Sequence, residues 1–215
     1  RYSLTPFTVP VTCRNGGTLM KTLVSWSSGK DSAWMVHVLR QRGDVEIGAL
    51  LTTINEPAQR VAMHAVRVEV LQAQAGALGV PLWMVPIPSP CPNEVYEQAM
   101  RETVARAVRA GFTHAAFGDL FLEDIRKYRE DQLAGSGLTP MFPLFDTDPT
   151  YTKRLARNMV AGQLRARITC LDPTVLDRAF AGREFDAALL DELPAAIDPC
   201  GQRGEFHTCA YAGPM

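Results

Sequence analysis

The sequence predicts an α/β protein: a doubly wound, mainly parallel sheet of about five strands, followed by a smaller C-terminal α+β lobe. Three observations lead to this prediction. Short β-prone apolar runs alternate with amphipathic helical segments from Met20 onward, which is typical of right-handed β-α-β crossovers. Polar turns follow these runs, at the positions where parallel sheets bind ligands. The composition changes after about residue 135, where glycine, proline and aspartate gather.

The first strand and the first helix flank an unusual turn. Residues 22–26 form a short apolar run followed by Ser and Gly, which predicts a buried strand. Residues 31–41 predict a helix, and Gly43 marks its end. Residues 46–53, with the sequence EIGALLTT, predict the second strand.

The second crossover is expected to contain a long helix. Its apolar residues recur at spacings of three and four, so they form one face of a helix that ends at Gly79. These residues are Val61, Ala65, Val68, Leu71, Ala75 and Leu78. Residues 82–86 then predict the third strand.

The third crossover begins with a proline-rich connector, PIPSPCP. Asn93 is the expected N-cap of a helix that runs to about Arg109 and stops at Gly111. Residues 113–117 predict the fourth strand. Since ligands bind outside the carboxyl ends of parallel strands, the turns after the four strands form the candidate site. These turns are residues 25–32, 52–55, 86–91 and 118–123.

The rest of the chain predicts a lobe that folds back on the sheet. A helix over residues 152–161 and a strand over 165–171 precede a glycine-punctuated stretch, DPCGQRGEFHTCAY, that ends in an alternating pattern. We therefore divide the chain into three parts: an N-terminal extension or cloning remnant, a nucleotide-binding domain and a substrate-binding lobe. Their ranges are 1–19, 20–134 and 135–215. A packed N-terminal arm is the alternative for the first part.

Composition excludes several classes of function. The 215 residues are 47% hydrophobic and 21% charged, as in ordinary globular proteins. A net charge of −1 argues against a nucleic-acid binder, and no apolar run approaches the ~20 residues that cross a bilayer. The five cysteines are scattered without a C-x-x-C pair, which argues against a disulfide framework and a standard zinc site. They are Cys13, Cys91, Cys170, Cys200 and Cys209. We read no secretory signal and expect a cytoplasmic location.

The turn in LVSWSSGKDSAW, residues 23–34, suits an anion. It fits neither the P-loop pattern nor the dinucleotide pattern, because Val24 replaces the first Gly and Asp31 replaces the hydroxyl after Lys30. Small residues expose backbone N–H groups, and a helix N-terminus adds partial positive charge. Asp31 would repel a polyphosphate unless a cation lay between them, so the Lys-Asp pair predicts a metal-bridged polyphosphate. The alternative is that Ser and Asp only cap the helix and Lys30 is solvated.

These residues resemble a known family. SSGKDS is similar to the SGGxDS signature of the PP-loop ATP pyrophosphatases, which have a HUP-type fold, and within them to the diphthine–ammonia ligase-like (adenine nucleotide alpha hydrolase-like) group. The matching segments are LLTTIN (50–55), RVAMH (60–64), FGDL (117–120), ITCLDP (168–173), FAGREFD (180–186) and DPCGQRGEFHT (198–208). Two departures stand out. Ser28 replaces the second Gly, which the turn tolerates if φ stays negative there. In the last segment, His207 and Gln202 stand where the group commonly has Glu.

The resemblance implies an enzyme that cleaves ATP between the α and β phosphates, with Mg²⁺ bound. An acceptor oxygen attacks the α-phosphorus, pyrophosphate leaves, and ammonia then converts the adenylated acceptor to an amide. The acceptor is a small molecule or a protein side chain. Two alternatives stay open: a PP-loop RNA sulfurtransferase and a non-catalytic nucleotide-binding module. No membrane partner is expected, and the oligomeric state is open, with a homodimer as one alternative.

Position and resemblance together assign candidate site residues. Catalysis is assigned to Lys30, Asp31, Glu205 and His207. Nucleotide binding is assigned to Ser25, Ser27, Ser28, Gly29, Lys30, Asp31, Ser32, Thr52, Thr53, Asn55 and Gly118. Acceptor binding is assigned to His64, Asp119, Arg126, Gly204, Glu205, His207 and Thr208, and Mg²⁺ to Asp31 and Asp119. The alternatives are a structural histidine at 64, a solvated helix face at 126 and an ordinary turn at 204–208.

Overall fold

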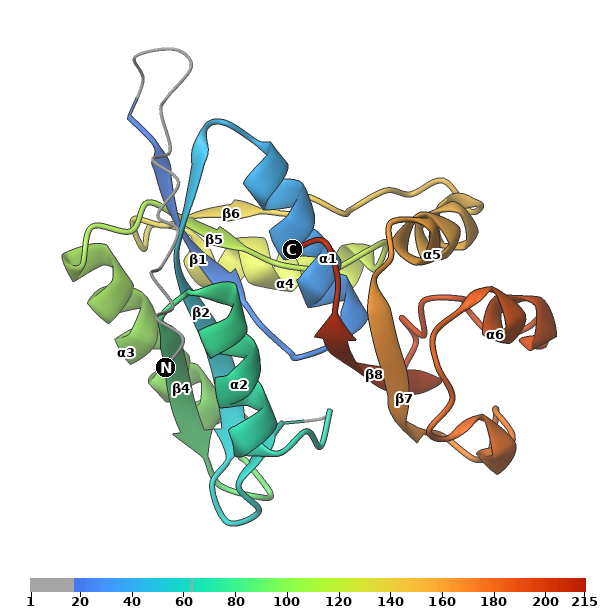
Figure 1. Ribbon diagram of the computed structural model, residues 1–215. Coiled ribbons are helices and arrows are strands. Elements are labelled where there is room, and N and C mark those ends of the chain that lie inside the picture. The colour runs from blue at the N-terminus through green and yellow to red at the C-terminus, as the bar shows by residue number, and fades with distance from the viewer. Residues whose placement is uncertain (1–17, 63) are drawn as a thin grey trace, which may run out of the picture.

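Two sheets organise the chain, and they confirm the predicted α/β fold with a smaller C-terminal lobe. The computed structural model describes residues 18–62 and 64–215. A six-stranded sheet carries helices on both faces, and a two-stranded antiparallel sheet lies beside it (Figure 1). The predicted extension at 1–19 falls almost entirely outside the described residues.

Five parallel strands form the main sheet in the order β4-β2-β1-β5-β6. Their bounds are Met20–Ser25 for β1, Val45–Asn55 for β2, Leu82–Ile87 for β4, His114–Ala116 for β5 and Thr139–Met141 for β6. The chain first proceeds outward from β1 to β2 and β4, then returns to the other side of β1. The switch point therefore lies between the carboxyl ends of β1 and β5, where open α/β sheets bind their ligands.

The short strand β3 (Arg60–Val61) occupies an unusual place. It pairs antiparallel with Ile54 and Asn55 of β2, and those two residues also pair with β4. Because a strand has only two edges, β3 must lie on the edge that β1 uses, beyond the point where β1 ends. It brings the following loop, which contains His64, to the carboxyl end of the sheet.

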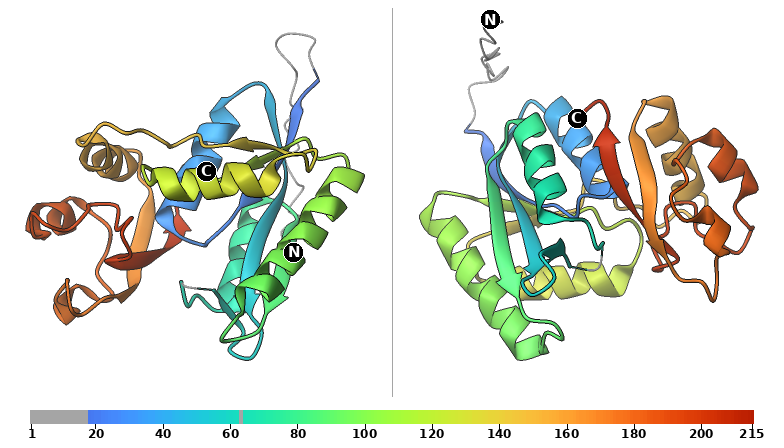
Figure 2. Two further views of the ribbon diagram at one scale, coloured as in Figure 1. Left: turned by 180° about the vertical axis from the view of Figure 1, so that it is seen from behind. Right: turned by 60° about the horizontal axis from the view of Figure 1, so that its bottom comes forward.

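Right-handed crossovers place the helices. The helices α1 (Lys30–Gln41) and α2 (Val68–Leu78) cover one face, and α3 (Asn93–Arg109) and α4 (Glu123–Leu133) cover the other (Figures 1 and 2). Successive side chains of β1 point to opposite faces of the sheet: Val24 packs in the core under α1, and Leu23 packs in the core under α3. No helix within the described ranges combines the length and apolarity needed to span a bilayer.

Two sequence expectations in this domain were wrong. The helix expected from Val61 begins at Val68, because Val61 pairs in β3 and Ala65 adopts a positive φ of 56° that no α-helix contains. The apolar spacing of Val61 and Ala65 therefore matched a helical period by coincidence. The second is the N-cap of α3, which was expected at Asn93: Pro92 is the N-cap, and Asn93 is the first residue of the helix.

The proline-containing segment at 139–141, for which the sequence predicted no strand, forms β6 at the sheet edge, where a strand tolerates proline.

The C-terminal lobe is built on β7 and β8. Its elements are α5 (Tyr151–Ala161), β7 (Arg165–Leu171), a short 3-10 helix (Arg178–Phe180), α6 (Ala187–Glu192) and β8 (Phe206–Ala212). The two strands pair antiparallel, and β8 lies against the start of α1. Because β6 pairs within the main sheet, the smaller sheet starts well after residue 135, and the domain boundary at 134/135 stays a prediction.

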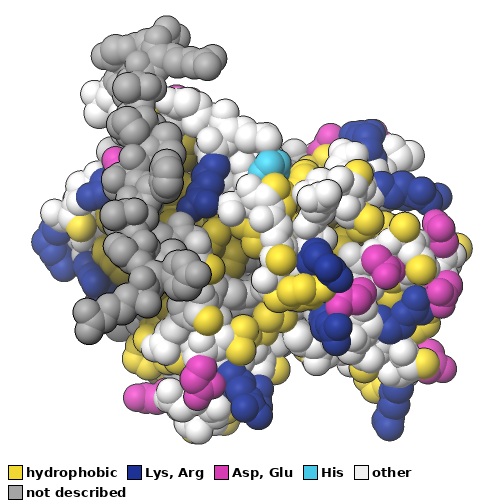
Figure 3. Space-filling view, viewed as in Figure 1, with side chains coloured by type: hydrophobic (Ala, Val, Ile, Leu, Met, Phe, Trp, Pro, Cys, Tyr) yellow, Lys and Arg dark blue, Asp and Glu magenta, His cyan; other side chains and the backbone are white. Residues whose placement is uncertain are grey.

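Charges of both signs are interspersed on the lobe. Figure 3 shows basic and acidic side chains side by side over it. Three of these pairs are Arg157–Asp191 at 3.2 Å, Arg167–Glu184 at 2.6 Å and Arg183–Glu192 at 2.6 Å. Such exposed pairs add little stability, but they neutralise the lobe locally.

Candidate functional site

A cleft of about 590 Å³ lies at the carboxyl ends of β1, β2 and β5, with β8 on its far side. It brings together most of the predicted site residues from five separate segments of the chain. These are Ser25, Ser27, Lys30, Asp31, Ser32, Thr52, Thr53, His64, Gly118, Asp119, His207 and Thr208. Gly118 packs against the start of α1: a Cβ added to Gly118 would lie 3.5 Å from the backbone nitrogen of Ser32.

The turn before α1 reverses the expected roles of its two central residues. Ser28 adopts φ +69°, so the expectation of a negative φ there was wrong, while Gly29 has an ordinary φ of −87°. The buried Ser28 hydroxyl has no hydrogen-bond partner in the described chain. Gly29 is needed for space instead, since a Cβ there would lie 3.0 Å from the His64 ring.

The strained turn is held by β8 and α2. The Ser28 carbonyl accepts hydrogen bonds from the Ala210 N–H at 2.8 Å and from Gln74 Nε2 at 3.2 Å. Gln74 also donates to the Ala210 carbonyl at 2.6 Å and accepts from Trp26 Nε1 at 3.2 Å. The Lys30 N–H donates to Thr208 Oγ1 at 3.1 Å. One glutamine and one strand thus fix the backbone that faces the cleft.

Lys30 is 2% exposed, yet it carries a charge. Its ammonium donates to Asp31 Oδ2 at 2.9 Å and to the Cys200 carbonyl, and it lies 5.5 Å from the ring centres of both Phe185 and Phe206. Burial alone would lower the pKa of Lys30, but the charges around it, led by Asp31, raise the pKa above its ordinary value. A fixed positive charge therefore stands at the base of the cleft.

Two carboxylates of the cleft each have one buried oxygen without a hydrogen-bond partner among the described residues. Asp31 Oδ1 and Asp119 Oδ2 are buried and accept no hydrogen bond from any described residue. Burial raises the pKa of both carboxyls, and the charge of Asp31 raises the pKa of Asp119 further. Unpartnered carboxylate oxygens near each other fit a divalent cation. The described residues contain no cluster of three or more metal-ligating side chains, so phosphate and water would supply the remaining ligands.

Two histidines face each other across the cleft. The rings of His64 and His207 have centres 4.6 Å apart, and His64 Nδ1 lies 3.4 Å from the Thr208 carbonyl. Burial, reinforced by His207, lowers the pKa of His64 from 6.5 to about 4. Burial also lowers the pKa of His207. Both rings are therefore neutral at neutral pH and can accept a proton.

Several predicted residues do not line the cleft. Asn55 accepts a hydrogen bond from the Ala58 N–H at 3.3 Å and so shapes the turn after β2. Arg126 pairs with Glu130 at 2.9 Å on the surface of α4 and lies over two phenylalanine rings. Ser28 and Gly29 are not part of the cleft lining either.

Glu205 also stays out of the cleft. It directly precedes β8, which begins at Phe206, and it is absent from the cleft lining, whereas His207 belongs to it. The Glu205 carboxylate accepts hydrogen bonds from the N–H groups of Asp198 at 3.0 Å and Arg203 at 2.9 Å. Together with Gly204, at φ +88°, it shapes the turn that delivers His207.

Sequence reasoning missed Arg129. Arg129 lies on α4 and lines the cleft. Its guanidinium packs over the Phe117 ring, 5.0 Å from the ring centre, and its Nε lies 3.7 Å from Asp119 Oδ2. That distance is too long for a hydrogen bond, and Nε has no partner within the part of the chain described. Ile125 and Arg129 are four residues apart, so they lie on the same face of α4, and both line the cleft. This spacing could have identified Arg129 only if the first residue of α4 had been known.

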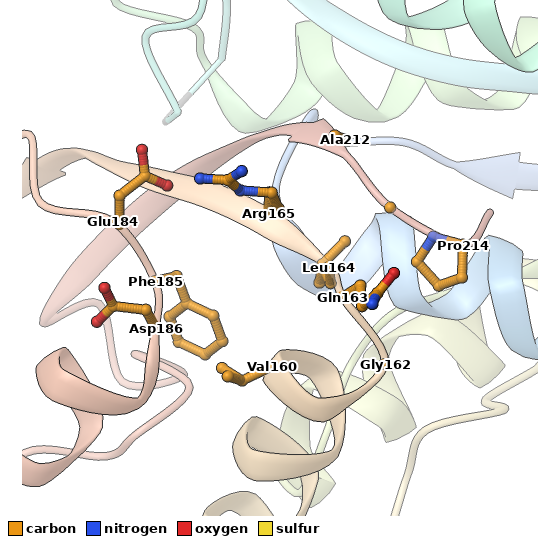
Figure 4. A pocket seen from close by; sticks show the side chains of 11 residues that line it. Val160, Gly162, Gln163, Leu164, Arg165, Glu184, Phe185, Asp186, Ala212 and Pro214 are labelled. Carbon is orange, nitrogen blue, oxygen red and sulfur yellow. The ribbon is translucent and has the colours of Figure 1, made fainter.

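A second hollow, of about 650 Å³, lies in the C-terminal lobe between α5, β7 and the end of β8 (Figure 4). Its acidic groups are already engaged: Glu184 pairs with Arg167 at 2.6 Å and accepts from the Tyr211 hydroxyl at 2.6 Å. Asp186 caps α6 by accepting from the Leu189 N–H at 2.8 Å. The hollow contains no predicted site residue, so we assign the functional site to the cleft.

Comparison with known proteins gives a family match and a structural neighbour. The family model described as "Diphthamide synthase N-terminal domain" matches residues 20–138. No curated protein shows significant similarity to the chain. Among solved structures, the chain is similar to the U34-tRNA thiolase NcsA from Methanococcus maripaludis, which was solved with its 4Fe–4S cluster. Sequence identity is 15%, the TM-score is 0.41, and the match spans 66% of this chain and 57% of the thiolase.

The reversed roles of Ser28 and Gly29 predict opposite effects of two small substitutions. Ser28→Gly replaces a serine held at positive φ by a residue that adopts this conformation without strain, and it removes an unpartnered hydroxyl. We therefore expect the free energy of unfolding to rise by about 1–2 kcal/mol. Gly29→Ala places a methyl group against the His64 ring, so we expect the free energy of unfolding to fall. Urea unfolding of both variants checks this, and two changes of the same sign would contradict it.

His64 predicts a pH dependence of stability. Because its folded-state pKa of about 4 lies below the ordinary 6.5, the stability tied to its neutral ring is complete above pH 6.5. That stability is lost as the pH falls toward 4, at about 1.4 kcal/mol per pH unit and about 3 kcal/mol in all. In His64→Gln, urea unfolding between pH 7 and 4.5 should show that the free energy of unfolding falls less steeply with pH than in the unaltered chain. An unchanged slope would rule this out.

Proposed function

Because the chain belongs to the diphthamide synthase N-terminal domain family, an ATP-utilising domain of the PP-loop superfamily, we propose that it cleaves ATP to AMP and pyrophosphate. The α-phosphate is transferred to a carboxylate acceptor, and ammonia then converts the adenylated acceptor to an amide. The observation that supports this most directly is that one cleft contains Lys30 and two carboxylates, each with one buried oxygen that has no hydrogen-bond partner among the described residues.

The cleft suits a polyphosphate with a metal ion. The Lys30 ammonium and the N-terminus of α1 supply positive charge, and the Ser27 and Ser32 hydroxyls stand 3.2 Å apart beside them. Asp31 Oδ1 and Asp119 Oδ2 would hold Mg²⁺, which neutralises phosphate charge when bound. Without such a cation, the two carboxylates would repel the nucleotide.

The remaining nucleotide contacts come from the end of β2. Thr52 is 3% exposed and donates its hydroxyl to the Trp26 carbonyl at 2.6 Å, so it shapes the cleft and leaves binding to the backbone. Leu51, Val61 and Ile87 add apolar walls on the same side. These groups would frame the adenosine, with the phosphates directed at α1.

The first chemical step makes one bond and breaks another. An oxygen of the acceptor carboxylate attacks the α-phosphorus, the bond from that phosphorus to the bridging oxygen breaks, and pyrophosphate takes the electron pair. Lys30 and the α1 N-terminus stabilise the charge that develops on the leaving group. Because Lys30 is buried and fixed by Asp31 and the Cys200 carbonyl, it needs no rearrangement to do so.

The second step needs a neutral base. Ammonia attacks the acyl carbon of the adenylate, AMP leaves with the electron pair, and one proton must be removed from nitrogen. His207 lines the cleft, and burial lowers its pKa, so its neutral ring can take that proton. We assign Glu205 the role of positioning the turn that carries His207.

Sulfur transfer to RNA finds less support in the cleft. Cys200 lines it, but its thiol donates to the Thr152 carbonyl at 3.5 Å. Burial raises the pKa of that thiol well above its ordinary value, which leaves it protonated. A buried thiol is a poor sulfur nucleophile.

Product analysis tests the proposal. Incubation with Mg²⁺-ATP, ammonia and a panel of carboxylic acids should give AMP and pyrophosphate, and Lys30→Met and Asp119→Asn should each slow turnover by about 10²–10³-fold. Lys127→Met is the matched control for the lysine change, since Lys127 is exposed and pairs with Asp131 on α4. Circular dichroism establishes folding of each variant. ADP as the product, or near-normal rates in both site variants, would refute the proposal.

A further inference from the structure

A smaller pocket adjoins the cleft between α3 and α4. It has a volume of about 230 Å³. Its lining consists of Tyr96, Glu97, Met100, Arg101, Val104, Ala105, Phe117, Tyr128, Arg129, Gln132, Leu133 and Ser136. Tyr96, Met100, Phe117 and Arg129 line both this pocket and the cleft. A molecule that reaches the nucleotide from this side can therefore occupy both.

The interior of this side pocket is apolar. Leu133 is 6% exposed and forms part of the core between the sheet and these helices, with Val104 and Phe117 packed against the same core. Met100 adds a flexible apolar wall that adapts to the shape of a ligand. Three polar side chains of the lining, those of Glu97, Arg101 and Tyr128, are exposed to solvent. Such a lining favours an aliphatic or aromatic group over a charged one.

The border between pocket and cleft carries a cation with unused donor capacity. Arg129 packs over Phe117, and its buried Nε has no hydrogen-bond acceptor among the residues described. Its nearest carboxylate, Asp119, stands 3.7 Å away. The Arg129 side chain is 27% exposed, so its guanidinium is open to a ligand while its Nε still lacks an acceptor. Such a guanidinium binds a carboxylate well, because charge and fork geometry match.

The position of Arg129 also agrees with the chemistry. Its partner Asp119 is one of the two carboxylates that would hold the metal beside the phosphates. A carboxylate bound to Arg129 therefore lies next to the bond that is broken. An apolar group attached to that carboxylate would extend away from the nucleotide, into the side pocket.

We propose that the acceptor is a small carboxylic acid with an apolar tail, its carboxylate held by Arg129 and its tail in the side pocket. This inference depends on the proposed function for the identity of the reaction, but the binding site itself stands on the pocket and on Arg129. A free acid fits better than a protein side chain, because the pocket is small and encloses one apolar group.

Calorimetry with acetate, hexanoate and 4-phenylbutyrate, in the presence of Mg²⁺ and a non-hydrolysable ATP analogue, tests the site. We expect 4-phenylbutyrate to bind at least about tenfold more tightly than acetate, and the corresponding amide to bind weakly. Val104→Trp fills the pocket and should abolish the difference between the acids, with ATP-analogue affinity unchanged. Arg129→Gln should abolish the preference for acid over amide.

Val95→Trp is the matched control, since Val95 is 44% exposed on the same helix and lies outside the pocket. It should behave as the unaltered chain does. Equal binding of acetate and 4-phenylbutyrate, or an unchanged preference in Val104→Trp, overturns the inference. A different result would refute the proposed function: the formation of ADP instead of AMP and pyrophosphate. Turnover to AMP with polar or peptide-borne carboxylates alone would keep that function and overturn the apolar acceptor.

Discussion

A positive charge sealed from solvent governs the architecture around the cleft. The Lys30 ammonium is tolerable only where acceptors surround it, and they come from distant parts of the chain: the Asp31 carboxylate, the Cys200 carbonyl and the faces of two phenylalanine rings. A lysine at the first position of α1 thus requires the C-terminal lobe to close over it. The charge that would serve the nucleotide therefore also contacts residues of the C-terminal lobe.

The same dependence extends to the backbone of the nucleotide turn. Ser28 is held in a left-handed conformation by hydrogen bonds from Ala210 and Gln74, and Lys30 is tied to Thr208. The segment that matches the family model ends at residue 138, before any residue of β8. The turn before α1 therefore takes its shape partly from Gln74 inside the matched region and partly from Thr208 and Ala210 outside it. We infer that nucleotide binding and the position of His207 on β8 are mechanically linked.

Much of the fold followed from local pattern, and its failures have physical causes. Strand and helix alternation placed β1, β2, β4, β5 and β7 within a few residues, because buried parallel strands are locally apolar. Val61 misled because sheet pairing overrode a helical spacing, and Ser28 because tertiary hydrogen bonds imposed a φ that its residue type disfavours. Arg129 was missed for a third reason: which face of α4 points inward depends on packing. Cleft residues next to strand ends were predictable, whereas residues brought in by helices or by the lobe required the folded chain.

The bond between the Lys30 N–H and Thr208 joins groups 178 positions apart. Contacts this distant in sequence form late, because loop closure must precede them. At a synthesis rate of about 5–20 residues per second, Thr208 leaves the ribosome roughly 10 to 35 s after Lys30. During that interval the parallel sheet can assemble, but its nucleotide turn lacks the strand that shapes it. A nascent chain therefore acquires the full set of hydrogen bonds around this turn only after the second lobe has been made.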